Sequence, residues 1–77
     1  MQMSYKNKEI SVRDDGEELT VQVSASSLQA MDIALRMADR VGGKYFLSEI
    51  MDGLEGKFFW IEFPNKQSLL SFRSLCC

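Results

Sequence analysis

The side chains that most often carry out proton transfer, nucleophilic attack or metal binding are scarce in this chain of 77 residues. It contains no histidine, and so it lacks the most frequent general base and the most frequent metal ligand. Its two cysteines, Cys76 and Cys77, are adjacent and cannot supply the paired ligands of a zinc site. Serine and carboxylate side chains occur, but in no recognised catalytic constellation. The sequence predicts a protein that is not an enzyme and that uses no cofactor and no metal.

The adjacent cysteines also resemble the double prenylation signal of small vesicle-traffic GTPases, but no other part of that family's sequence is present. We therefore interpret residues 76–77 as a fraying tail that carries two free thiols. The first ten residues contain no hydrophobic signal-peptide core, and the longest uninterrupted run of bulky apolar residues is 58–61. We expect a cytoplasmic protein that makes no contact with a membrane.

The charge distribution argues against a surface that binds phosphate groups. The net charge is −2, the isoelectric point is near 5.0, and the nine basic residues are scattered along the chain. Binding of nucleic acid usually needs a cluster of lysine and arginine on one face, so a nucleic-acid partner is disfavoured. The acidic residues concentrate in DDGEE, residues 14–18, which most simply forms a solvated turn.

The most distinctive stretch is GKFFWIEFP, residues 56–64, which is rich in large apolar side chains. In a strand, alternate side chains point to opposite faces, so Phe58 and Trp60 would lie on one face and Phe59, Ile61 and Phe63 on the other. A small chain usually has enough material to cover only one face of its sheet. The sequence therefore raises the question of what covers Phe58 and Trp60.

Two alternating segments, residues 8–13 and 19–24, flank the acidic turn and predict a β-hairpin. In the second segment the apolar residues point toward the core, while Thr20 and Gln22 point away from it. Thr20 and Gln22 are thus expected on the same side of the sheet as Trp60.

Residues 25–43 carry the strongest helical pattern in the chain. Ser26 and Gln29 have the spacing of a capping box, and the pair Gly42 and Gly43 supplies a C-terminal stop. Apolar side chains occupy a wider arc of this helix than a sheet alone would cover. A second helix beside it, or a partner protein, must therefore contact it.

Residues 44–52 predict a third strand, but both alternating phases contain apolar side chains. One phase would bury the Glu49 carboxylate without a partner, which is costly. We adopt the other phase, which leaves Glu49 in water and buries Phe46, Ser48 and Ile50. This choice adds three apolar residues to the face that carries Trp60: Tyr45, Leu47 and Met51.

The stretch GKFFWIEFP supplies a fourth strand, residues 57–63, and Asn65 can cap a last helix over residues 66–76. The order ββαββα predicts one α+β domain over residues 1–77, with a four-stranded antiparallel sheet and two helices on one face. A ferredoxin-like fold accommodates this order. Its final strand is missing here, and residues 8–13 could fill the vacated edge in a circularly permuted version. Residues 1–7 are expected to form a flexible lead or to cover the open face.

Residues 56–72 resemble the RNA recognition motif, a ferredoxin-like family. Its longer signature places two aromatic residues on a central strand, and Phe58 and Trp60 match those places. In that family these aromatics stack on bases, so the resemblance implies binding of single-stranded nucleic acid. The chain departs from the family in several respects. Gly56 precedes Lys57 instead of following a basic residue, and the bulky Phe59 stands where the family has a small residue. The neighbouring strand has polar residues where the family has an aromatic, the final strand is absent, and the domain is acidic.

Two functional hypotheses remain. The first is a small protein-binding module, either an adaptor or inhibitor or a homodimer, whose open sheet face would carry Phe58, Trp60, Tyr45, Leu47, Met51, Thr20 and Gln22. Aromatic and methionine side chains with little charge are typical of protein interfaces. The second is binding of single-stranded RNA or DNA, with the same aromatics stacking on bases and with Arg13, Lys44 and Lys57 near phosphates. The acidic composition favours the first hypothesis.

Overall fold

The computed structural model describes residues 9–76 except residues 15, 17 and 55. The predicted covering lead, residues 1–7, and the end of the predicted tail, Cys77, lie outside the described residues. The elements follow one another as β1 (Ile10–Asp14), β2 (Thr20–Ala25), α1 (Leu28–Arg40), the 3₁₀ turn η1 (Leu47–Glu49), β3 (Met51–Gly53), β4 (Gly56–Glu62) and α2 (Lys66–Cys76).

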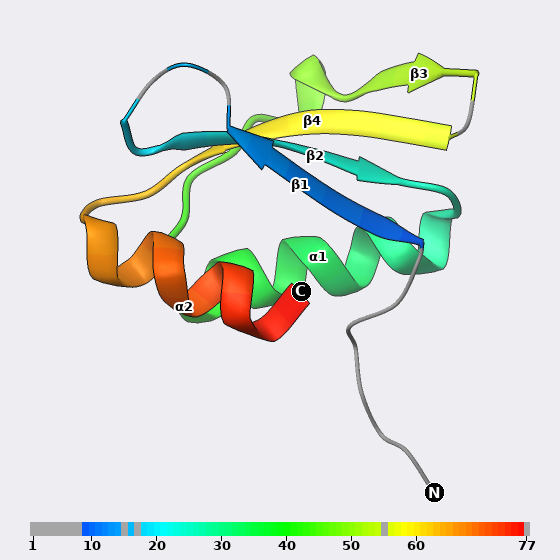
Figure 1. The fold of residues 1–77 in the computed structure, drawn as a ribbon. Coiled ribbons are helices and arrows are strands. Elements are labelled where there is room, and N and C mark those ends of the chain that lie inside the picture. Colours follow the sequence, from blue (N-terminus) through cyan, green and yellow to red (C-terminus); the bar gives the residue numbers. More distant parts are fainter. Residues whose placement is uncertain (1–8, 15, 17, 55, 77) are drawn as a thin grey trace, which may run out of the picture.

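The four strands form one antiparallel sheet in the order β1-β2-β4-β3. Both helices lie on the same face of this sheet, and no element covers the opposite face of β1 and β2 in the part of the chain that is described (Figure 1). The predicted α+β architecture, with a four-stranded antiparallel sheet and two helices, is confirmed. The predicted hairpin is present as β1 and β2, paired with Val12 opposite Val23.

The core lies between the sheet and the two helices. Phe59, Ile61 and Phe63 are almost completely buried, as their alternation along β4 predicts. The ring of Phe63 lies against that of Phe72 on α2, with 5.2 Å between the ring centroids. On the neighbouring strand β2, Val21 and the other inward-facing residues complete the apolar surface that the sheet turns toward the helices.

The N-terminal cap of α1 is Ser27, and the prediction of Ser26 was wrong by one residue. The Ala30 backbone N–H donates to the Ser27 hydroxyl oxygen over 3.1 Å, which satisfies one of the free amides of the first turn. Ser26 instead continues the pairing of β2, because its N–H donates to the Glu9 carbonyl oxygen over 2.9 Å. At the other end, the chain leaves the helix through Gly42, whose φ of 80° is the left-handed conformation that glycine adopts readily. The predicted C-terminal stop is confirmed.

The wide apolar arc of α1 has the explanation that the sequence offered, because α1 packs against both the sheet and α2. Ala34 and Ala38 are completely buried, and their small side chains allow close approach of the neighbouring elements. Leu28 is the exception on this arc, with 64% of its surface exposed. The cap predicted for the last helix is also present: the Ser68 N–H donates to Asn65 Oδ1 over 2.8 Å.

The predicted strand over residues 44–52 is wrong in extent. Lys44 forms an isolated bridge with Glu62, and regular pairing resumes only at Met51, which lies opposite Phe58. Between these two contacts the chain advances seven residues, from 44 to 51, while β4 advances four, from 58 to 62. The three surplus residues cannot pair with β4 and form the 3₁₀ turn η1. Strand β3 is therefore only three residues long.

The start of β4 comes unusually close to the end of β2. Gly56 has a φ of 131°, and a Cβ atom on it would lie 2.2 Å from the Ala25 carbonyl oxygen. Only glycine fits this backbone conformation and this separation. Gly56 thus permits β4 to enter the sheet directly beside β2.

Candidate partner-binding surface

The face of the sheet that is turned away from the helices carries Phe58 and Trp60. On β2, Ser24 lies opposite Phe58 and Gln22 lies opposite Trp60. Thr20 lies opposite Glu62, two positions further along the same face. On the other side of β4, Met51 is the partner of Phe58. The register thus brings together five of the seven residues that the sequence assigned to this surface: Phe58, Trp60, Met51, Thr20 and Gln22.

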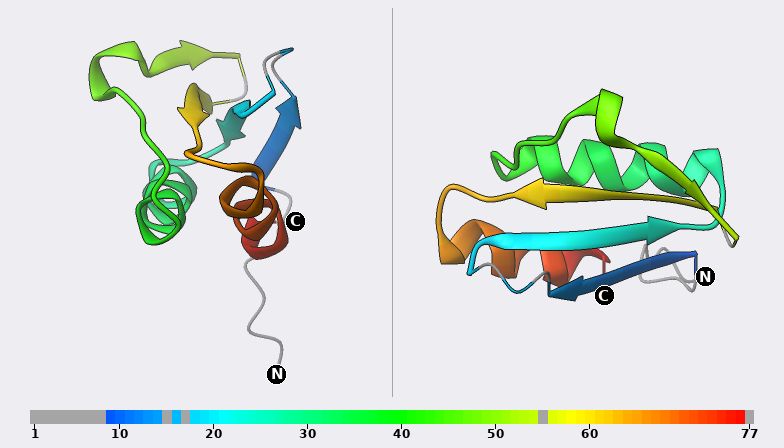
Figure 2. Two further views of the ribbon diagram at one scale, coloured as in Figure 1. Left: turned by 90° about the vertical axis from the view of Figure 1, so that its left-hand side faces the viewer. Right: turned by 90° about the horizontal axis from the view of Figure 1, so that it is seen from above.

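Phe58 and Trp60 are partly buried, and part of the cover comes from the chain itself. Their rings meet edge to face, with centroids 5.6 Å apart and planes at 75°. The Phe58 ring also lies against the backbone of β3, since a Cβ atom on Gly53 would be 3.2 Å from two of its carbon atoms. Figure 2 shows the reason: the segment from η1 to β3 does not continue the plane of the sheet but rises over β4 on the side away from the helices.

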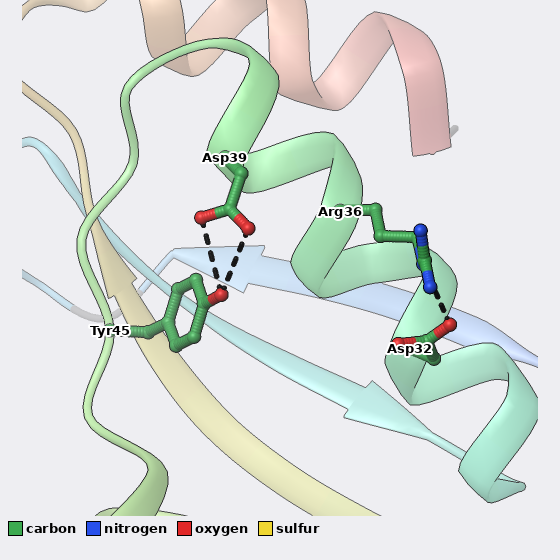
Figure 3. A network of polar contacts seen from close by, with 4 residues as sticks. All are labelled: Asp32, Arg36, Asp39 and Tyr45. Carbon is green, nitrogen blue, oxygen red and sulfur yellow. Dashed lines mark hydrogen bonds and ion pairs between the residues drawn. The ribbon is translucent and has the colours of Figure 1, made fainter.

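Tyr45 does not belong to this surface, contrary to the phase chosen from the sequence. Its hydroxyl donates to the Asp39 carboxylate at the end of α1, at 3.2 Å from Oδ1 and 3.1 Å from Oδ2 (Figure 3). Its ring packs against the edge of the core. Partial burial, together with the hydrogen bond to Asp39, raises the pKa of Tyr45 above its ordinary value of 10.0. The hydrogen bond fixes the loop that follows α1 before the chain reaches η1.

The residues that the chosen phase placed in the core are not buried either: Phe46 is 58% exposed, Ser48 is exposed and Ile50 is only partly buried. Because η1 interrupts the strand, neither alternating phase applies to the segment. Three other apolar residues of the same segment are exposed, namely Leu47 (68%), Met51 (52%) and Leu54 (106%). We call residues 46–54 the apolar ridge. Sequence reasoning missed Phe46 and Leu54, although apolar residues in both phases were a signal that this segment is not a regular strand.

A hollow of about 370 Å³ opens beside Phe58, between the apolar ridge and the start of β1. It is lined by residues of all four strands and of the segments next to them, with side chains that include Ser11, Ser24 and Lys57. Hydroxyl groups and one aromatic ring thus lie side by side in a shallow depression. Such a depression can receive a side chain of a bound protein.

The basic residues that the nucleic-acid hypothesis invoked do not gather around the aromatic rings. Lys57 forms an ion pair with Asp52 across β3 and β4, so its charge is largely compensated. Lys44 lies at the opposite end of β4, next to the acidic Glu62. Arg13 is exposed on the open face, two strands away from Trp60. Among the described residues, the surface therefore lacks the continuous positive track that a phosphate backbone requires.

Within the described part of the chain, no three His, Cys, Asp or Glu side chains are close enough to hold a metal ion. No helix among these residues is long and apolar enough to cross a membrane. The pair Asp32 and Arg36 on α1 is joined by one hydrogen bond of 2.8 Å on an exposed helix face (Figure 3), where such pairs contribute little.

No protein-family model, curated protein or solved structure matches this chain.

Proposed function

We propose that this protein is a non-enzymatic protein-binding module, an adaptor or an inhibitor, which uses the apolar ridge together with Phe58 and Trp60. The observation that carries the proposal is the position of the exposed apolar side chains. Of the six large hydrophobic residues that are more than half exposed in the described chain, four lie in the apolar ridge. Single exposed hydrophobic residues need no explanation, but four of them within nine consecutive residues concentrate apolar surface on one segment, which is typical of an interaction site.

The size and composition of this surface suit a protein partner. At the exposed fractions given above, each of the four side chains offers on the order of 100 Å² of apolar area. Together they approach the roughly 300–600 Å² of the largest patch on a typical monomer, which is often functional. Thr20 and Gln22 border the aromatic rings on β2 and are partly buried, so they add hydrogen-bonding groups without charge. An apolar centre with a polar rim is the usual anatomy of an interface.

We also propose that the topology is a circularly permuted form of the ferredoxin-like fold. The series β2, α1, β3, β4, α2 supplies the strand-helix-strand-strand-helix portion of that fold. The missing final strand is replaced by β1, which lies at the edge beside β2. This arrangement supports a relationship to the RNA recognition motif at the level of the fold, whereas the ion pair on Lys57 and the separation of the basic residues favour a protein ligand.

Site-specific photo-crosslinking tests the proposed function. A photoreactive amino acid at Leu54, the most exposed residue of the apolar ridge, is expected to capture a protein from an extract of the native host. The matched control carries the same group at Gln29, which is exposed on α1 in the helix layer. An excess of unmodified protein should suppress capture at Leu54, and an excess of the Phe58→Ala, Trp60→Ala variant should not.

Three outcomes would contradict the proposal. Equal capture at Gln29 and Leu54 would show that the contact is nonspecific. Loss of far-ultraviolet circular dichroism in the double variant would show that Phe58 and Trp60 serve the core rather than a partner. Quenching of Trp60 fluorescence by micromolar mixed-sequence RNA or single-stranded DNA at low salt would show that this surface binds nucleic acid rather than a protein.

A further inference from the structure

Strand β1 forms one edge of the sheet, and its hydrogen-bonding groups alternate in direction. The Ser26 N–H donates to the Glu9 carbonyl oxygen, so residues 9 and 26 form a hydrogen-bonded pair in the register that places Ser11 opposite Ser24. In an antiparallel ladder such pairs alternate with pairs that exchange no hydrogen bond. The backbone groups of Ser11 and Arg13 therefore point toward β2, whereas those of Ile10, Val12 and Asp14 point outward. In the view from above, no other described element lies along this outer edge (Figure 2).

The two edges of the sheet differ in how far they are protected. Strand β3 has only three residues and is preceded by the irregular η1 turn, and short or irregular edge strands are a common protection against pairing with another chain. Strand β1 has five residues, pairs with β2 without interruption and contains no proline. An edge of this length without such protection is a template for a further strand.

We propose that β1 is a dimerisation edge, at which two copies of this chain pair antiparallel about a two-fold axis at Ser11. Pairing through the outward groups of Ile10, Val12 and Asp14 allows axes at residues 11, 12 or 13. An axis at Arg13 would place two arginines directly opposite each other, which is destabilising. An axis at Val12 would place Arg13 opposite the partner's Ser11. An axis at Ser11 places Arg13 opposite the partner's Glu9, so that opposite charges face each other twice.

The Ser11 register suits both faces of the joined strands. On the helix side, Ile10 lies opposite the partner's Val12, and the two residues exchange two hydrogen bonds. On the open side, Ser11 meets the partner's Ser11 in a pair without hydrogen bonds, where side chains are closest and small ones fit. Ser27 donates to a carboxylate oxygen of Glu9 over 2.9 Å and holds this carboxylate at the end of β1. A carboxylate accepts several hydrogen bonds, so the guanidinium of the partner's Arg13 can bind it as well.

The dimer has a continuous eight-stranded sheet with all four helices on one side. Because the axis is perpendicular to the sheet, both open faces point in the same direction. Five inter-strand spacings separate the two β4 strands, which corresponds to about 24 Å. If the proposed protein-binding function holds, the dimer therefore presents two aromatic surfaces to one partner assembly. The dimer itself does not depend on that function.

Hydrogen exchange at two protein concentrations tests the edge directly. The Ser11 and Arg13 amides, which point toward β2, should be protected at both concentrations. The Ile10 and Val12 amides should be protected only at the higher protein concentration. Sedimentation velocity should show a dimer at that concentration. Fast exchange of the Val12 amide at millimolar protein would overturn the proposal. Protection of Val12 that does not change with concentration would also overturn it, because the edge would then be covered within one chain.

A charge exchange tests the register. Glu9→Arg alone and Arg13→Glu alone each place two like-charged pairs at the axis, so each should raise the dimer dissociation constant at least tenfold. An equimolar mixture of the two variants should restore dimerisation, because the mixed dimer has two attractive pairs. Glu9→Ala is the control for loss of the bond to Ser27, because it removes the acceptor oxygen without adding a positive charge. If the mixture stays monomeric while both variants remain folded by circular dichroism, the Ser11 register is wrong.

Discussion

Gly56 offers the sharpest test of how the sheet is assembled. Its φ of 131° belongs to a region that is essentially restricted to glycine, and an alanine there stores about 1–3 kcal/mol of strain. The added Cβ atom would also lie 2.2 Å from the Ala25 carbonyl oxygen and 2.7 Å from the Ser26 Cα atom, both backbone atoms that cannot rotate away. Relief requires separation of β4 from β2 at the pair formed by Ala25 and Lys57.

The loss of the two hydrogen bonds of that pair costs about 1–3 kcal/mol. Gly56→Ala should therefore lower the free energy of unfolding by about 2–6 kcal/mol, a large part of the roughly 4–12 kcal/mol expected for a domain of this size. The matched control is Gly16→Ala. Gly16 also has a positive φ, of 86°, but a Cβ atom there would meet nothing within 4 Å. Only backbone strain of about 1–2 kcal/mol is then expected.

Urea denaturation measures both variants, followed by the fluorescence of the single tryptophan, Trp60, and by far-ultraviolet circular dichroism. The midpoint for Gly56→Ala should lie well below that for Gly16→Ala, with an unchanged slope. Each kcal/mol corresponds to about 4–8 °C in the melting temperature. Equal destabilisation by the two substitutions would refute the reasoning, because the close contact between β2 and β4 would then contribute nothing.

Two further predictions concern hydrogen bonds. Ser27→Ala should lower the free energy of unfolding by about 1 kcal/mol through loss of the α1 cap, whereas Ser26→Ala should be nearly neutral. The midpoints of urea denaturation distinguish the two variants. A larger loss of stability in Ser26→Ala than in Ser27→Ala would instead support the capping box predicted from the sequence. The Tyr45 phenol, followed by ultraviolet difference titration against Tyr45→Phe, should titrate above 10, and Asp39→Asn should lower its pKa. Because the folded state holds this proton more tightly than the unfolded chain, the stability it contributes is present below pH 10 and is lost as the pH rises through the folded pKa. An unchanged pKa in Asp39→Asn would contradict the assigned bond.

The regular elements could be predicted because their signals are local. The alternation of β2 and β4 identified Val21, Phe59 and Ile61 as core residues, and all three are buried. Gly42 marked the end of α1 through a conformation that glycine favours wherever it occurs. The cap of α1 was misplaced by one residue because Ser26 and Ser27 are chemically alike. Only the pairing of Ser26 with Glu9 in the sheet distinguishes them.

The composition and periodicity of this sequence determine an α+β domain with one strand that is apolar on both faces. They do so because hydrophobic spacing and turn residues act within a few positions of the chain. The tertiary structure alone decides which apolar residues stay in contact with solvent. The register between β4 and the segment after α1 leaves that segment three residues longer than the part of β4 it faces. The resulting η1 turn leaves Leu47 exposed, and the adopted alternating phase does not apply. A register is a relation between distant segments, so neither segment reveals it by itself.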